Sequence, residues 1–226
     1  MKAVIIEDER SIIDAITVAF EFRWPEVELK AAMTGKNGVS LVKNEHPDIV
    51  ILDINLPDIS GFEALKRIRE FSSVPVIIVT VRADDTDVLR GLESGADDYI
   101  VKPFNYLTLL ARIKTVLRRT ENIPLKATQD TMVSSRLKID FVNQHVTVDN
   151  HPVKLTPVEY RLLVLLAQNK GEVVPYKLIA ERIWQKKPAD VSEHIRIYVR
   201  RLRNKLNDTP PGIVVNHRGS GYILKG

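Results

Sequence analysis

The sequence predicts an α/β domain with a five-stranded parallel sheet, followed by a smaller α+β domain. In the first half, short apolar runs alternate with amphipathic stretches, which is typical of βαβ units. The second half combines strand-like alternating runs, helical stretches and a glycine-rich hairpin near its end. The charge divides in the same way, because residues 1–119 carry a net −3 and residues 120–226 a net +7. Only the second half is therefore expected to bind a polyanion.

The predicted parallel sheet is organised around the run Ile49-Val50-Ile51-Leu52. Four consecutive apolar residues indicate a central strand that is buried on both faces. Strands are expected near residues 3–7, 27–32, 48–53, 75–80 and 98–101, and helices near 10–22, 36–45, 60–71, 84–94 and 105–119. Five such units predict a doubly wound sheet of flavodoxin-like strand order, whose ligand crevice lies between the first and third strands.

Chemically matched side chains follow four of these strands. Glu7 and Asp8 follow the first strand, Asp53 the third, Thr80 the fourth and Lys102 the fifth. Three carboxylates at one sheet edge repel one another unless a cation lies among them, and oxygen ligands without His or Cys indicate Mg²⁺ (or Mn²⁺). The lysine and the hydroxyl suit phosphoryl oxygens, so Asp53 is a candidate phosphoryl acceptor. A buried ion-pair network is the alternative interpretation.

The composition limits the compartment and the membrane contacts that we expect. The chain has no cysteine, which favours a reducing cytoplasm over a disulfide-forming compartment. The N-terminus enters a strand at Ala3, so it does not resemble a signal peptide. No apolar run approaches the roughly 18 residues of a membrane span. We therefore expect a cytoplasmic protein without a membrane partner.

The second half begins after a segment without periodicity. Residues 120–135 carry Thr, Ser, Asn and one Pro, and we interpret them as a linker between domains at 1–119 and 136–226. Expected elements are strands at 137–140 and 145–148, a helix opened by the capping box Thr156–Glu159, a helix at 176–184, a helix at about 191–206 and a hairpin at 213–224.

The helix at about 191–206 is the candidate nucleic-acid reader. One face is apolar, with Val191, Ile195, Val199, Leu202 and Leu206. Basic side chains cover other faces: His194, Arg196, Arg200, Arg201, Arg203 and Lys205. Cations this dense repel one another, and a helix of this size fits the major groove of DNA. A helix-turn-helix context and a basic hairpin tip favour DNA over a merely solvated basic face.

Two stretches of the first half resemble the receiver domain of bacterial two-component response regulators. They are Leu56-Pro57-Asp58-Ile59-Ser60-Gly61 and residues 95–104, Gly-Ala-Asp-Asp-Tyr-Ile-Val-Lys-Pro-Phe, and the acidic pair, the Asp, the Thr and the Lys-Pro at the strand ends match the same family. The resemblance implies that a sensor histidine kinase phosphorylates Asp53. It also implies that Mg²⁺ is held by Asp8, Asp53 and the backbone carbonyl of Asn55, with Glu7 acting through water. Thr80 and Tyr99 would form the switch pair, and the Lys102–Pro103 bond would be cis.

The second half resembles the winged-helix effector of the OmpR/PhoB subfamily. The matching segments are LTPVEYRLLVLLAQNKGEVV, HIRIYVRRLRNKL and HRGSGYIL. The resemblance implies that the 191–206 helix reads promoter DNA, that Arg218 on the wing reaches the minor groove, and that the 185–190 loop is a possible RNA polymerase contact. His217 is either a phosphate contact of the wing or a solvated loop residue.

The subfamily resemblance also implies a homodimer of activated receivers. Two cross-subunit ion pairs carry over, Asp98 with Arg112 and Glu93 with Arg119, around an apolar patch of Leu89, Leu92 and Leu110. A third pair is replaced at both ends by Val88 and Thr108.

The expected function is a phosphorylation-activated, DNA-binding transcriptional regulator, with no enzymatic activity beyond the Mg²⁺-dependent phosphorylation and dephosphorylation of Asp53. One alternative is a regulator whose receiver only dimerises, independently of phosphate. A second is an aspartyl-phosphate hydrolase, but that class requires a second acid where this chain has Asn55.

Overall fold

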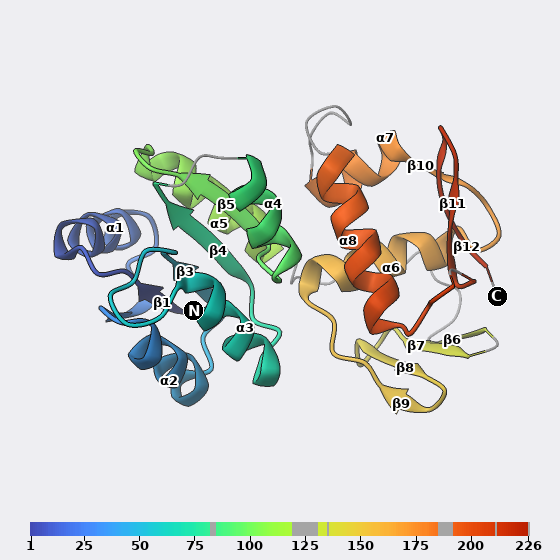
Figure 1. Cartoon of the computed structure of the whole chain (residues 1–226), viewed down its shortest axis with the longest axis horizontal. Coiled ribbons are helices and arrows are strands. Elements are labelled where there is room, and N and C mark those ends of the chain that lie inside the picture. Colours follow the sequence, from blue (N-terminus) through green and yellow to red (C-terminus); the bar gives the residue numbers. More distant parts are fainter. Residues whose placement is uncertain (82–84, 119–130, 135, 185–191, 211, 226) are drawn as a thin grey trace. The chain divides into compact units, whose positions relative to one another are not determined.

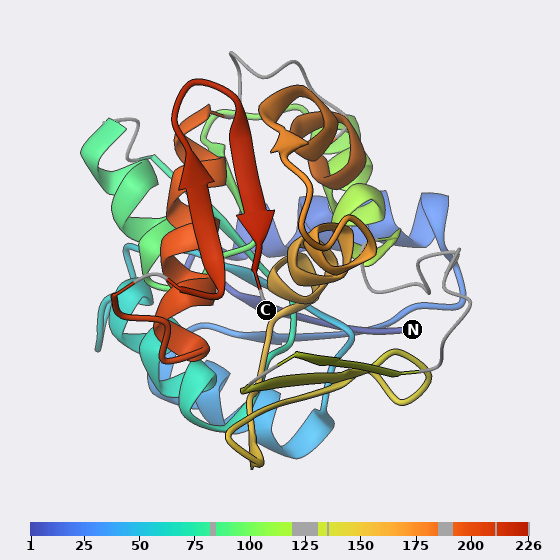
Figure 2. The same ribbon diagram turned by 90° about the vertical axis from the view of Figure 1, so that its right-hand side faces the viewer.

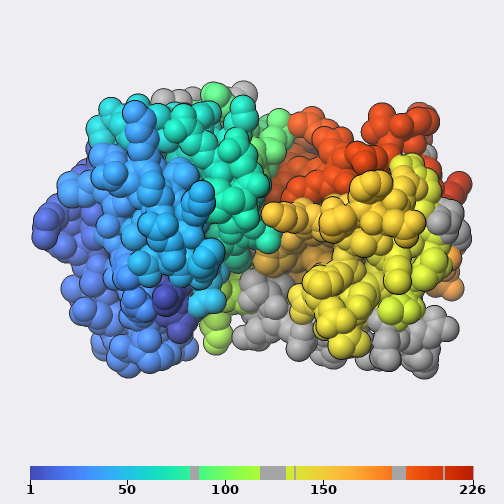
Figure 3. All heavy atoms as spheres, turned by 90° about the horizontal axis from the view of Figure 1, so that it is seen from below, coloured from blue at the N-terminus to red at the C-terminus, as the bar shows by residue number. Residues whose placement is uncertain are grey.

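The computed structural model describes residues 1–81, 85–118, 131–134, 136–184, 192–210 and 212–225. The chain divides into two compact units, Met1–Arg118 and Arg119–Gly226. In the space-filling view the first unit runs from blue to green and the second from yellow to red (Figure 3). Among the described residues, every helix is too short or too polar to cross a membrane.

The first unit is a five-stranded parallel sheet with helices on both faces (Figure 1). Its elements are β1 (Lys2–Ile6), α1 (Arg10–Arg23), β2 (Glu28–Ala32), α2 (Gly35–Glu45), β3 (Ile49–Leu52), α3 (Gly61–Phe71), β4 (Val76–Thr80), α4 (Asp85–Glu93), β5 (Asp98–Val101) and α5 (Tyr106–Arg118). The strand order is β2-β1-β3-β4-β5. The predicted doubly wound topology is therefore confirmed, with β1 and β3 side by side in the centre.

The sheet separates two hydrophobic cores, and alternate residues of each central strand belong to opposite cores. In β3, Ile49 and Ile51 pack into the core beneath α1 and α5, whereas Val50 and Leu52 pack into the core beneath α2 and α3. All four residues are buried, at 0–2% exposed. The uninterrupted apolar run follows from this arrangement, because neither face of the strand contacts water.

The second unit contains two small sheets and a set of helices. Its elements are β6 (Thr131–Ser134), β7 (Leu137–Asp140), β8 (His145–Val148), β9 (His151–Pro152), α6 (Pro157–Gln168), β10 (Val174–Pro175), α7 (Tyr176–Ile179), the π-helix η1 (Ala180–Trp184), α8 (Ser192–Lys205), β11 (Val214–His217) and β12 (Gly221–Leu224). The antiparallel sheets have the orders β6-β7-β8-β9 and β10-β12-β11. Figure 2 shows β11 and β12 in red as a two-stranded ribbon beside α8.

The predicted linker is too long at its C-terminal end. Residues 131–134 were expected in it, but they form β6 and pair with β7 in antiparallel register. The remaining linker residues 120–130, together with 135, lie outside the described residues. The two-residue strands β9 and β10 were also not predicted, because segments this short carry no periodicity.

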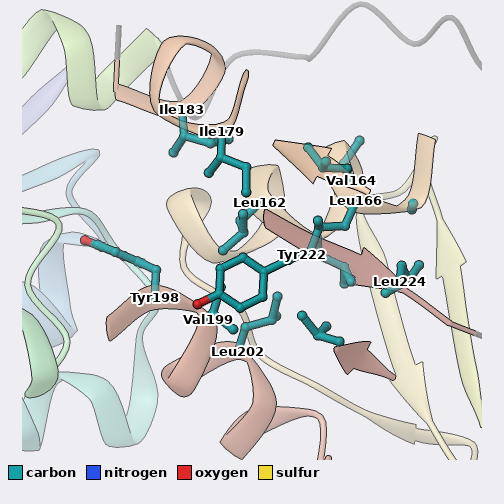
Figure 4. Close-up of a cluster of buried hydrophobic side chains, with 14 of the residues drawn as sticks. Leu162, Val164, Leu166, Ile179, Ile183, Tyr198, Val199, Leu202, Tyr222 and Leu224 are labelled. Atoms are coloured by element: carbon teal, nitrogen blue, oxygen red, sulfur yellow. The ribbon is translucent and has the colours of Figure 1, made fainter. Parts of the chain in front are cut away.

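The core of the second unit holds α8 against the rest of the fold. Figure 4 shows the ring of Tyr222, from β12, lying among Leu162, Val199 and Leu202. Leu162 comes from α6, while Val199 and Leu202 come from α8, and all four residues are at most 3% exposed. Four members of the predicted apolar face, Ile195, Val199, Leu202 and Leu206, therefore pack on the core as predicted, while Val191 lies outside the described residues.

Candidate functional site

The strand-end carboxylates of the first unit converge as predicted. Glu7 follows β1 and Asp53 follows β3, and these neighbouring parallel strands bring the two residues to the same sheet edge. Glu7 is 2% and Asp53 4% exposed, while Asp8 retains solvent contact. One carboxylate oxygen from each of the three residues lies within 4.8 Å of the others. We call these three side chains the acidic cluster.

A single lysine serves both buried carboxylates of the acidic cluster. The Lys102 ammonium donates to Oε2 of Glu7 at 2.7 Å and to Oδ2 of Asp53 at 2.8 Å. Its side chain is only 7% exposed. Among the described residues, the ammonium of Lys102 therefore faces two buried carboxylates and the nearby Asp8, so the positive charge that pairs with these carboxylates is smaller than their negative charge.

The pKa values reflect this shortage. Burial raises the pKa of Glu7 to about 7, the charge of Asp53 adds to the rise, and the hydrogen bond from Lys102 opposes it. Burial alone would lower the pKa of Lys102, but its hydrogen bonds to Asp53 and Glu7 outweigh burial and raise it. The clustered carboxylate oxygens form a hard donor set, and a divalent cation would relieve their repulsion. These residues fit a Mg²⁺ ion.

The loop that follows Asp53 is held by backbone contacts. Asp53 Oδ1 accepts hydrogen bonds from the backbone N–H of Ile54 at 2.6 Å and of Asn55 at 3.2 Å. Further along the loop, both carboxylate oxygens of Asp58 accept from the first N–H groups of α2, at Gly35 (2.7 Å) and Lys36 (2.9 Å). A hollow of about 430 Å³ lined by Asp8 and residues 54–60 opens beside this loop.

The expected switch residues lie on the two neighbouring strands. Thr80 ends β4 and is fully buried, and its carbonyl accepts from the backbone N–H of Lys102 at 2.8 Å. The ring of Tyr99 is buried, at 8% exposed. It lies against α4 at Gly91, where an added Cβ would come within 3.2 Å of the ring. The Lys102–Pro103 peptide bond is cis, as the resemblance implied.

The basic helix α8 presents fewer exposed cations than the sequence predicted. Arg196 and Arg200 are exposed, and Arg196 pairs with Glu193 on the same helix at 3.0 Å. The prediction that Arg201 is exposed is wrong. Its side chain is 9% exposed, forms an ion pair with Glu159 at 2.7 Å, and lies over the ring of Tyr198.

Glu159 is the partner that sequence reasoning missed. It is fully buried, and its Oε2 accepts from Lys205 Nζ at 2.6 Å and from the Thr156 backbone N–H at 2.8 Å. Burial alone would raise the pKa of Glu159, but the charges of Arg201 and Lys205 outweigh it and lower the pKa. The capping box identified the Thr156 contact, and the i,i+4 spacing of Arg201 and Lys205 was the available signal for the rest. We call Glu159, Arg201 and Lys205 the α8 anchor.

The other expected DNA contacts lie in different environments. Arg203 is half-buried, and its Nε donates to the Val214 carbonyl at 2.8 Å. His194 is half-buried, with its ring centroid 6.4 Å from that of Trp184. His217 and Arg218 are exposed at the end of the β11–β12 hairpin. The 185–190 loop lies outside the described residues.

The residues predicted to form the dimer face differ from the prediction in two respects. Asp98 and Arg112 pair within one chain, with Arg112 Nη1 donating to both carboxylate oxygens at 2.8 and 2.9 Å. Leu110 belongs to a hydrophobic core cluster and Leu92 is 1% exposed, so neither contributes to an exposed patch. The other expected members are Leu89, which is half-buried, Glu93, which is exposed, and Arg119, which lies outside the described residues.

Comparison with known proteins matches both units. Residues 3–114 match the family described as response regulator receiver domain, and residues 150–224 the family described as transcriptional regulatory protein, C terminal. The chain is 37% identical over 223 residues to the transcriptional regulatory protein AfsQ1 of Streptomyces coelicolor, covering 98% of this chain and 96% of that protein. It is 34% identical to the response regulator ArlR of Staphylococcus aureus, covering 98% of each.

A solved structure agrees with these matches. The response regulator DrrB, a Thermotoga maritima OmpR/PhoB homolog, is 31% identical, with a TM-score of 0.52 over 100% of this chain and 99% of that chain.

Proposed function

The chain belongs to the OmpR/PhoB family of response regulators, and we propose that Asp53 is the residue through which a sensor histidine kinase controls it. Membership makes it a phosphorylation-activated, DNA-binding transcriptional regulator. The observation that carries the assignment to Asp53 is its burial at the end of β3, within hydrogen-bond distance of Lys102 and beside Glu7 and Asp8. We propose that the protein acts in the cytoplasm, where it would meet both the kinase and the promoter DNA.

The chemistry is a transfer between two nucleophiles. A carboxylate oxygen of Asp53 attacks the phosphorus of the kinase phosphohistidine, the P–N bond breaks, and its electron pair returns to the imidazole. The Lys102 ammonium offsets charge on the transferred oxygens, and the Thr80 hydroxyl is available to donate to one of them. Asp8, Asp53 and the Asn55 carbonyl would hold Mg²⁺ (or Mn²⁺), with Glu7 acting through water, and the ion would supply further positive charge there.

Tyr99 and Thr80 are the proposed switch. The Tyr99 ring already lies buried beside α4, in the space that the absent side chain of Gly91 leaves. When the Thr80 hydroxyl turns toward the phosphoryl group, it leaves room at the end of β4 and keeps the ring in this inward position. Phosphorylation thereby stabilises the inward arrangement of α4 and β5.

The activated receivers are proposed to pair through α4, β5 and α5. The pair between Asp98 and Arg112 then has to exchange its partner within the chain for one across the interface. Such half-exposed pairs are each worth roughly 0–1 kcal/mol, so the exchange is close to neutral. Sedimentation of the beryllofluoride-treated protein checks this, and Arg112→Ala should weaken the dimer. An Arg112→Ala dimer as tight as the wild type would exclude this face.

DNA contact is proposed for Arg196 and Arg200 on α8 and for Arg218 on the hairpin, because all three are exposed. His194 is a weaker candidate, since its ring packs beside Trp184. Arg201 is not proposed as a DNA contact, because it is buried in the α8 anchor. The 185–190 loop remains a proposed RNA polymerase contact on resemblance alone.

Two experiments test the function. Acetyl phosphate with Mg²⁺ followed by intact-mass measurement should show one stable addition on the wild type and none on Asp53→Ala. Continuous turnover would instead indicate a hydrolase, and DNA binding with no addition would indicate a phosphate-independent receiver. Selection from random duplexes should then enrich one sequence, and the absence of any enrichment would exclude sequence-specific reading.

A further inference from the structure

The turn between α8 and β11 is built around a buried carboxylate. Asp208 lies three residues beyond the end of α8 and is 3% exposed. Its Oδ1 accepts from the backbone N–H of Gly212 at 2.6 Å and of Ile213 at 2.8 Å, and its Oδ2 accepts from that of Val214 at 2.8 Å. Three hydrogen bonds to one carboxyl group hold the chain just before the wing in one conformation.

The first residue of the wing is held at both of its backbone groups. The N–H of Val214 donates to Asp208, and the Val214 carbonyl accepts from Nε of Arg203 on α8. The Arg203 guanidinium also lies 5.8 Å from the centre of the Tyr222 ring, on the second strand of the wing. Helix and wing are therefore joined by polar contacts at the root of the hairpin.

The position of the hairpin tip depends on the angle of the hairpin at its root. Arg218 lies four residues beyond Val214, which corresponds to about 13 Å along an extended strand. A tilt of about 10° at the root would therefore move the tip by about 2 Å, more than a hydrogen bond to DNA tolerates. β10 also holds the second strand of the hairpin, because Pro175 pairs with Gly221 and the Tyr176 N–H donates to the Ser220 carbonyl at 3.1 Å. The root contacts therefore set the angle between this small sheet and α8, and a sheet that tilts there would lose the Arg218 contact while the helix kept its own.

We propose that Asp208 and Arg203 are positioning residues, which hold the wing at the angle where Arg218 and α8 engage one duplex together. This rests on the proposed DNA contact of Arg218. Although Arg203 lies on the basic helix, its proposed role is therefore to position the wing and not to read bases.

A double-mutant cycle in the full-length protein tests the proposal with the duplex selected above. Arg218→Ala should weaken binding about tenfold in the wild type but less than twofold in Asp208→Asn, because a wing whose angle to α8 is no longer fixed at its root contributes little. Asn keeps the size of Asp but replaces one acceptor oxygen with an NH₂ group. General loss of stability would lower both affinities and leave the Arg218 effect at about tenfold, so circular dichroism of each variant accompanies the cycle.

Arg203→Met provides the second variant, because Met keeps the stem over Tyr222 and removes the donor. A positioning role predicts that Arg203→Met also reduces the effect of Arg218→Ala to less than twofold. A direct phosphate contact predicts instead a salt slope lower by about 0.9 and an undiminished Arg218 effect. Arg200→Ala is the matched control, since an exposed cation on α8 should combine additively with Arg218→Ala.

The outcomes separate this proposal from the one on which it rests. If the wild type does not prefer the selected duplex, the DNA function itself fails. If it does, but Arg218→Ala has no effect or keeps its full effect in both positioning variants, the positioning role is excluded. Should Asp208→Asn not fold, Arg203→Met decides alone.

Discussion

Each unit of the chain buries acidic and basic side chains together, in opposite proportions. In the acidic cluster, Glu7 and Asp53 share Lys102, whereas in the α8 anchor, Glu159 is shared by Arg201 and Lys205. The pKa values move accordingly, upward for Glu7 and downward for Glu159. Similar groups at similar burial therefore differ in whether their charge is balanced within the fold.

Access explains why we propose only the acidic cluster as a reactive site. The acidic cluster lies at a sheet edge, with Asp8 toward solvent and a hollow beside it. Glu159 is fully buried beneath α8, and both of its carboxylate oxygens are occupied by cations of that helix. A deficit of positive charge at an open edge can bind a cation, whereas a closed, compensated cluster can only fix the position of a helix.

The largest expected effect separates chemistry from stability in the acidic cluster. Asp53→Asn should abolish labelling by acetyl phosphate completely, because an amide is not a nucleophile for phosphorus. It should leave the free energy of unfolding unchanged or slightly higher, since it removes one of two carboxylates that compete for Lys102. Intact-mass measurement and urea unfolding check the two halves. A large loss of stability would mean that Asp53 is mainly structural, and it would contradict the contrast between the acidic cluster and the α8 anchor.

The same kind of change in the α8 anchor should act on stability instead. Glu159→Gln leaves Arg201 and Lys205 without their counter-charge and should lower the free energy of unfolding by about 3 kcal/mol. In a Trp24→Phe background, the buried Trp184 reports on the second unit alone during denaturation. Glu181→Gln is the matched control, because Glu181 is exposed in the same unit and should change little. Equal effects of the two variants would remove the contrast between the clusters.

The two units should respond to pH in opposite directions. The folded pKa of Glu7 is raised, so its contribution to stability is present below about pH 4.5 and is lost as the pH rises toward 7. The pKa of Glu159 is lowered, so its contribution is present above its unfolded pKa and is lost as the pH falls through the folded value. We expect the Mg²⁺-free first unit to lose about 2 kcal/mol between pH 5 and 8, because each pKa unit is worth about 1.4 kcal/mol.

Chemical denaturation at a series of pH values checks this prediction. Trp24 in a Trp184→Phe background reports on the first unit, and Glu7→Gln should flatten its profile. If the profile of Glu7→Gln retains the wild-type slope, another group is responsible.

The smallest effect concerns access to the acidic cluster. Val81 follows Thr80 and is 58% exposed, and we expect its stiff, branched side chain to crowd the path to Asp53. Val81→Ala should accelerate phosphorylation by acetyl phosphate and the subsequent loss of the phosphoryl group a few-fold each. Rates followed by intact mass decide the matter, and no acceleration of either step would show that Val81 does not restrict access.

The contrast also marks where the sequence was sufficient. The strands of the first unit and the convergence of Glu7, Asp53 and Lys102 followed from apolar runs with polar residues at their ends. The prediction that Arg201 is exposed was wrong because Arg201 directly precedes Leu202, at the border of the apolar face. Periodicity does not distinguish an exposed side chain from a buried one at such a position. Arg201 is buried because Glu159, on another helix, lies within ion-pair distance of it, and such a contact depends on the tertiary structure. Strand β6 was missed because it is a short edge strand whose partner alone identifies it.

The alternation of β3 between two cores has a consequence for how the strand finds its place. A slip by one residue would exchange Ile49 and Ile51 with Val50 and Leu52, and both faces would remain apolar. Hydrophobicity therefore does not fix the alignment of β3 against its neighbours. The polar residues at its two ends do, because a slip would draw a carboxylate, Asp48 or Asp53, into the sheet. The proposed phosphoacceptor would thus also mark alignment during folding, and Asp53→Leu, unlike Asp53→Asn, should give heterogeneous amide NMR signals for β3.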